Sequence, residues 1–101
     1  MIRDKWQIDD EYRKRCIGNI VGKMGALRAA MDMSQDELAS LIGVSRSTLN
    51  AMETGRREMS WTVYLAITAV FFANDQTRAV LKEFNLYPKE FVQRIADNSE
   101  L

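Results

Sequence analysis

The segment from Gln35 to Thr54, QDELASLIGVSRSTLNAMET, constrains the fold most, because two helix starts and one helix stop fall within or beside it. Ser34 and Glu37 have the spacing of a capping box, in which a hydroxyl and a carboxylate satisfy amide groups at a helix N-terminus. Gly43 can adopt the left-handed conformation that ends many helices. Ser45 then offers a second N-cap. The sequence therefore predicts two short helices joined by a tight turn.

A turn this short forces the two helices to cross steeply. Ala39 supplies a small side chain where the second helix presses against the first, and Leu49 and Met52 bury the inner face of the second helix. The side chains that remain on its outer face are Arg46, Ser47, Asn50, Ala51 and Thr54.

The spacing of these residues resembles the Xre/Cro family of phage repressors and small bacterial regulators. The resemblance covers about residues 17–73, with the two-helix motif at 35–54. It rests on Arg28, Gln35, Glu37-Leu38-Ala39, Gly43-Val44-Ser45, Leu49, Glu53 and Gly55-Arg56-Arg57. It implies an all-α fold: a lambda-repressor-like helix-turn-helix domain of five helices, with an extra C-terminal helix or helices.

The resemblance also implies site residues, since in that family the second helix enters the major groove. Base contacts fall on Arg46, Ser47, Asn50 and Ala51. DNA backbone contacts fall on Gln35, Ser45, Thr54, Arg56 and Arg57. The resemblance further pairs Arg28 with Glu53 as a structural ion pair that fixes one helix on another.

The chemistry of these side chains agrees with such roles. Arg46 can offer two parallel donors to guanine O6 and N7, and it could equally grip a phosphate. Asn50 suits adenine, and Ala51 can offer only a methyl contact, for instance to thymine. Gln35 at a helix N-terminus adds a donor to free amides and a partial positive charge. The alternative reading makes Arg46 a solvated surface residue, or the motif a protein-binding device.

Charge is balanced overall, because fourteen basic residues face fourteen acidic ones. The segment from Gly43 to Arg57 is locally +2, with Arg46, Arg56 and Arg57 against Glu53, so the rest of the chain carries −2. A protein so balanced should depend on a correctly shaped face and on dimerisation, and should bind non-specific DNA weakly.

The residue inventory argues against an enzyme, a metal site or a bound cofactor. The chain has no histidine, and its one cysteine, Cys16, has neither a ring base to activate it nor a second sulfur for zinc. The longest apolar run, Val63 to Ala73, is too short to span a bilayer. Together with the charged segment Met1 to Asp10, this predicts a cytoplasmic protein.

The rest of the chain, 101 residues in one domain, also has helical periodicity. We expect one helix from about Asp9 to Asp32, a central helix from Trp61 to Ala73 capped by Ser60, and a C-terminal helical extension at about 75–97. In that extension a shorter helix runs from Asn74-Asp75 to about Phe84, and a last one begins at Pro88 and ends near Ala96.

The C-terminal third has more apolar side chains than five helices require. A surface for a homodimer or another partner is predicted there, formed by Phe84, Leu86, Phe91, Val92 and Ile95, with Trp61 and Phe71 beside them. The alternative is that these residues fold back onto Val63 to Phe72 and complete the core.

Two functions follow from these observations. The first is a transcriptional regulator, most simply a repressor, that binds an inverted-repeat operator on double-stranded DNA as a dimer. The second is an antitoxin of a toxin–antitoxin pair, whose C-terminal helices bind the toxin and whose helix-turn-helix autoregulates.

Overall fold

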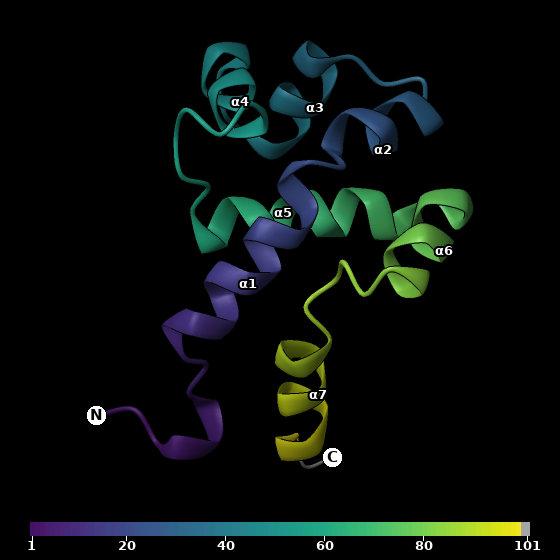
Figure 1. Ribbon diagram of the computed structural model, residues 1–101. Helices are drawn as coiled ribbons and strands as arrows, with labels where there is room; N and C mark the ends of the chain where they lie inside the picture. Colours follow the sequence, from purple (N-terminus) through teal and green to yellow (C-terminus); the bar gives the residue numbers. More distant parts are fainter. Residues whose placement is uncertain (100–101) are drawn as a thin grey trace.

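The computed structural model describes residues 1–99, and within them every regular element is helical (Figure 1). A 3₁₀ turn, η1, precedes seven α-helices. Their bounds are η1 Asp4–Trp6, α1 Asp10–Val21, α2 Met24–Ala30, α3 Gln35–Ile42, α4 Arg46–Glu53, α5 Trp61–Ala73, α6 Asp75–Glu83 and α7 Lys89–Asn98. The predicted all-α fold class is confirmed.

Capping residues set where α3 begins and ends and where α4 begins. The Ser34 hydroxyl accepts from the Glu37 N–H at 3.1 Å, and the Glu37 carboxylate accepts from the Ser34 N–H at 2.9 Å. Gly43 ends α3 with φ of +80°, and Ser45 caps α4 through the Thr48 N–H. Both short helices and the turn between them are therefore as predicted.

The predicted single helix from Asp9 to Asp32 is wrong, because the chain breaks at Gly22 and Lys23 into α1 and α2. The Lys23 N–H donates to the Ile20 carbonyl at 2.9 Å, which closes a tighter turn than an α-helix has. Glycine weakens a helix at this point. The change of direction lets Ile20 and Met24, on either side of the break, both bury completely.

Helix α5 runs through the middle of the molecule, with α2, α3 and α4 on one side and α7 on the other (Figure 1). It supplies Tyr64, Ile67 and Phe71 to a core that draws on α1 to α6 and on the two segments that follow α4 and α6. The other buried apolar side chains are Ile20, Met24, Leu27, Leu38, Ala39, Leu49, Met52, Met59, Leu81 and Leu86. The sequence-based assignment of Trp61 to Ala73 as the central helix is correct.

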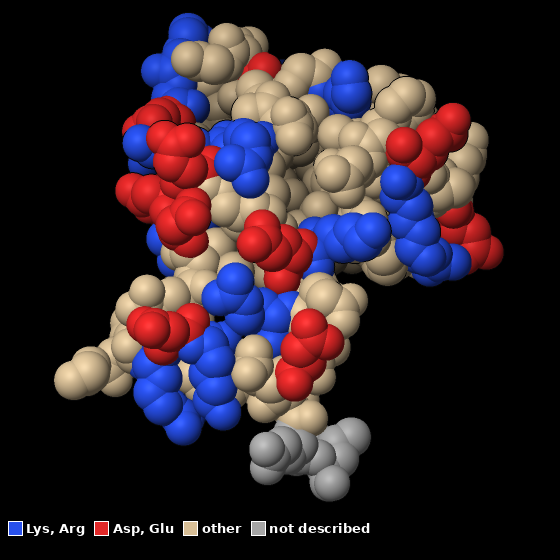
Figure 2. Space-filling model, turned by 60° about the horizontal axis from the view of Figure 1, so that its bottom comes forward, with Lys and Arg blue, Asp and Glu red and all other residues tan. Residues whose placement is uncertain are grey.

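The first turns of α1 and all of α7 project together from α5, on the side away from α3 and α4 (Figure 1). The Tyr12 hydroxyl joins them by accepting from the Glu90 and Phe91 N–H groups at 3.1 and 3.2 Å. Burial raises the pKa of Tyr12 to about 12, so this hydroxyl stays protonated at neutral pH. Figure 2 shows that basic and acidic side chains are interspersed on this end of the molecule.

The surface expected from the C-terminal third is only partly present. Leu86 is 2% exposed and Phe71 is fully buried, so both belong to the core. Phe91 is half-buried, edge-on against Trp61 with the ring centroids 5.7 Å apart. Phe84, Val92 and Ile95 stay exposed. The chain thus does both things that the sequence left open: it completes the core and leaves an apolar remainder.

Candidate nucleic-acid interface

The outer face of α4 consists of the side chains that the crossing with α3 leaves uncovered. Leu49 and Met52 point inward and are 0% and 2% exposed. On the other side Arg46, Ser47 and Thr54 are exposed, and Asn50 and Ala51 are half-buried.

An ion pair fixes α4 on α2. The Arg28 guanidinium donates to both oxygens of Glu53, each at 2.9 Å, and also to the Met33 carbonyl at 3.2 Å. The side chains of Arg28 and Glu53 are only 16% and 8% exposed. This geometry suits a structural role, since both charges are paired away from bulk water.

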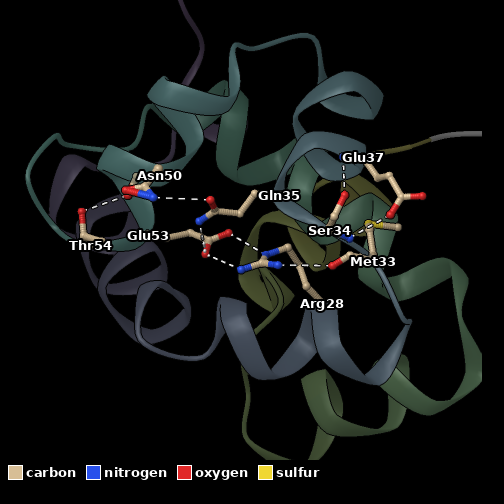
Figure 3. Close-up of polar contacts among 8 residues, drawn as sticks. All are labelled: Arg28, Met33, Ser34, Gln35, Glu37, Asn50, Glu53 and Thr54. Atoms are coloured by element: carbon tan, nitrogen blue, oxygen red, sulfur yellow. Dashed lines mark hydrogen bonds and ion pairs between the residues drawn. The ribbon is translucent and has the colours of Figure 1, made fainter.

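Glu53 is also one end of a polar chain, defined here as the side chains of Glu53, Gln35, Asn50 and Arg56 in that order. Gln35 donates to Glu53 at 3.2 Å and accepts from Asn50 at 3.4 Å, as Figure 3 shows. Asn50 in turn accepts from Arg56 at 3.0 Å. The start of α3 is thereby connected to the outer face of α4 through side chains alone.

A family profile described as a helix-turn-helix domain matches residues 21–81, more than half of the chain. The chain belongs to this helix-turn-helix family. The matched span contains α2 to α5 and most of α6, and so includes α3, α4 and the tight turn between them. No curated protein and no solved structure matches the chain.

The first turn of α4 in this helix-turn-helix domain faces an acid that sequence reasoning missed. Arg46 lies 3.9 Å from Asp36 of α3, measured from Nε to the nearer carboxylate oxygen. Both side chains are largely exposed, at 66% and 72%, so the pair is weak and leaves Arg46 free to move. No sequence signal marks this contact, because it depends on the angle at which α3 and α4 cross.

The remaining candidate residues lie at the two ends of α4. Ser45 donates to the Thr48 hydroxyl at 2.9 Å, and Arg57 reaches the same hydroxyl at 3.5 Å. Thr54 donates to the Asn50 carbonyl at 2.9 Å and accepts from Arg56 at 3.1 Å. No sequence motif marks Thr48, which nevertheless joins the start of α4 to the loop after it.

Within residues 1–99, no helix is both long and apolar enough to cross a membrane.

Proposed function

We propose that the protein is a sequence-specific transcriptional regulator, a repressor that binds an inverted-repeat operator as a dimer and inserts α4 in the major groove. The observation that carries this proposal is the uncovered outer face of α4 on a helix-turn-helix domain. A helix presented in this way fits the major groove of B-DNA. Arg46, Arg56 and Arg57, all exposed, supply positive charge beside it.

Base contacts are assigned to Arg46, Ser47, Asn50 and Ala51. Arg46 is long, exposed and only weakly held by Asp36, so it can turn toward guanine O6 and N7. Ser47 is exposed one residue further along α4. Asn50 and Ala51 are closer to the helix surface and require a close approach of the bases.

Backbone contacts are assigned to Gln35, Ser45, Thr54, Arg56 and Arg57. Gln35 and Ser45 stand at the N-terminal ends of α3 and α4, where free amides and the helix dipole attract phosphate. Arg56 has five N–H groups and uses one for Asn50 and one for Thr54. The other three remain for a phosphate.

The dimer contact is assigned to the apolar remainder of the C-terminal third. Val92 and Ile95, one turn apart on α7, are 51% and 43% exposed. Val92 also lines an apolar groove between α5 and α7, together with Leu65, Ala69, Phe72, Pro88 and Phe91 among others. A second copy that covered this groove would remove apolar surface from water and set two α4 helices in a fixed relation.

Selection of bound duplexes from a random library, at near-physiological salt, tests this function. We expect an inverted repeat whose half-sites lie about one helical turn apart, roughly 34 Å. Salt near the physiological value matters because counterion release dominates non-specific binding. Absence of any enriched sequence would contradict the proposal and shift support to the antitoxin-like alternative, in which the exposed C-terminal apolar residues bind another protein.

A further inference from the structure

We infer that Gln35 positions Asn50 so that Asn50 reads adenine on one DNA strand and not on the other. The inference rests on the proposed function and adds the base class that this site takes. It comes from the direction of the hydrogen bonds in the polar chain, which runs from Glu53 through Gln35 and Asn50 to Arg56. Figure 3 shows the part of the polar chain from Glu53 to Asn50.

Each end of the polar chain permits only one sense of hydrogen bonding. A carboxylate only accepts and a guanidinium only donates. Glu53 therefore requires the NH₂ group of Gln35, which turns the oxygen of Gln35 toward Asn50. The NH₂ group of Asn50 donates to that oxygen, and the oxygen of Asn50 accepts from Arg56.

A reversal of either amide is unfavourable. If Gln35 turned over, its oxygen would face the Glu53 carboxylate, and if Asn50 turned over, its NH₂ group would face the Arg56 guanidinium. Glu53 cannot rotate away to relieve this, because two hydrogen bonds from Arg28 hold both of its oxygens. The orientation of the Asn50 amide is thus set by two charged side chains, with Gln35 as the link to one of them.

Asn50 still has one N–H and one oxygen lone pair after these contacts. This is the pair of groups that binds adenine, whose N7 accepts and whose N6 donates in the major groove. In an A·T pair adenine lies on one strand, and in a T·A pair it lies on the other. The order of N7 and N6 across the major groove is therefore reversed between the two pairs. An amide of fixed orientation therefore matches one of these pairs and opposes the other.

The test compares variants by sequencing the duplexes that each one binds. For the unaltered protein we expect one position of each half-site to prefer A·T over T·A on the order of tenfold. Gln35→Met keeps the length of the side chain and leaves the Arg28–Glu53 pair in place. It should reduce that preference to within about twofold, while preferences at the other positions persist. Ser40→Ala, at an exposed residue of α3 outside both the polar chain and the assigned DNA contacts, is the matched control and should leave this position unchanged.

A second variant tests the assignment without altering Gln35. Asn50→Asp has nearly the same shape but only accepts, so the preference at this position should move from adenine to cytosine, whose N4 donates. This result is independent of whether Gln35→Met folds well. An adenine preference that survives in Asn50→Asp would overturn the assignment of this base to Asn50.

The side-chain NH₂ signals of Asn50 in the NMR spectrum of the free protein separate the two possible failures. In the unaltered protein they should exchange slowly with water, and in Gln35→Met at least several-fold faster. If exchange and base preference are both unchanged in Gln35→Met, the positioning role is wrong while the proposed function stands. If the unaltered protein enriches no duplex, the proposed function fails, and the reading role of Asn50 fails with it.

Discussion

Two ion pairs that involve α4 differ in their access to water, and this difference separates scaffold from surface. The Arg28–Glu53 pair is largely buried, whereas both members of the Arg46–Asp36 pair are more than half exposed. Removal of one partner from a buried pair leaves an uncompensated charge, and an exposed pair contributes little. Replacing arginine should therefore reduce stability at position 28 and base discrimination at position 46.

Arg28→Ala should lower the free energy of unfolding by about 3 kcal/mol, because Glu53 keeps Gln35 as a donor but loses both hydrogen bonds from the guanidinium. DNA binding should weaken only as a consequence of unfolding. Urea denaturation followed by circular dichroism measures the first effect. Titration of the operator at a temperature where the variant is folded measures the second.

Arg46→Ala is the matched control for that experiment. It should leave the melting temperature unchanged and remove about 1–3 kcal/mol of discrimination at one base pair. An unaltered melting temperature in Arg28→Ala would contradict the scaffold role. Unfolding of Arg46→Ala would show that its assignment to the reading face is mistaken.

At the scale of residues, the sequence indicates roles but not all contacts. Spacing along α4 identifies the outer face, since positions on a helix follow from its period. The link from Gln35 to Glu53 and Asn50 could not be predicted in this way, because it depends on the crossing angle of α3 and α4. For the same reason the sequence did not reveal the nearness of Asp36 to Arg46.

At the scale of elements, the predictions that held are those that local chemistry determines. Ser34, Ser45 and Ser60 each cap a helix where predicted, because an N-cap needs only the next turn of its own chain. The break between α1 and α2 was missed, because it depends on burial of Ile20 and Met24 against distant segments. The sequence left the burial of Leu86 open for the same reason, since that burial depends on contacts with distant segments.

The two helix-ending glycines near these elements should respond differently to substitution. Gly43 has φ of +80° and Gly22 has φ of −72°, while an added Cβ meets no atom within 4 Å at either. Gly43→Ala should therefore cost about 1–2 kcal/mol through the backbone alone. Gly22→Ala should be neutral or stabilise by up to about 1 kcal/mol. Urea denaturation of both variants measures this contrast, and equal effects would contradict it.

The capping box of α3 also predicts a pH dependence. Hydrogen bonds from the Ser34 N–H and hydroxyl lower the pKa of Glu37 from its ordinary value of 4.5. Because the folded value is the lower one, the stabilisation is complete above about pH 4.5. It is lost as the pH falls through the folded value. Glu37→Gln removes this titration, so its urea midpoint should fall less steeply below pH 4.5, and parallel curves would contradict the prediction.

At the scale of the whole molecule, the helix-turn-helix domain and the projecting end are built differently. The molecule measures 39 × 28 × 22 Å, with a radius of gyration of 14.2 Å against about 13 Å for a compact chain of this length. The radius of gyration exceeds the compact value because α1 and α7 extend beyond α5 (Figure 1). None of the residues of α7 is fully buried, so this helix adds little to the core. Its exposed apolar side chains would become buried only if a partner covered them.

This asymmetry allows a test of the dimer that spares the fold. Val92→Asp places a charge on the exposed side of α7, in the lining of the apolar groove. It should convert a dimer at micromolar concentration into a monomer with nearly the same melting temperature. Gln93→Lys is the matched control, because it also adds one charge to an exposed residue on another side of α7 and keeps a donor for Asp97, to which the Gln93 amide donates at 2.8 Å. Sedimentation equilibrium of the three proteins measures the change. An unaltered protein that stays monomeric with and without DNA would contradict the assignment, and so would a Val92→Asp protein that remains dimeric.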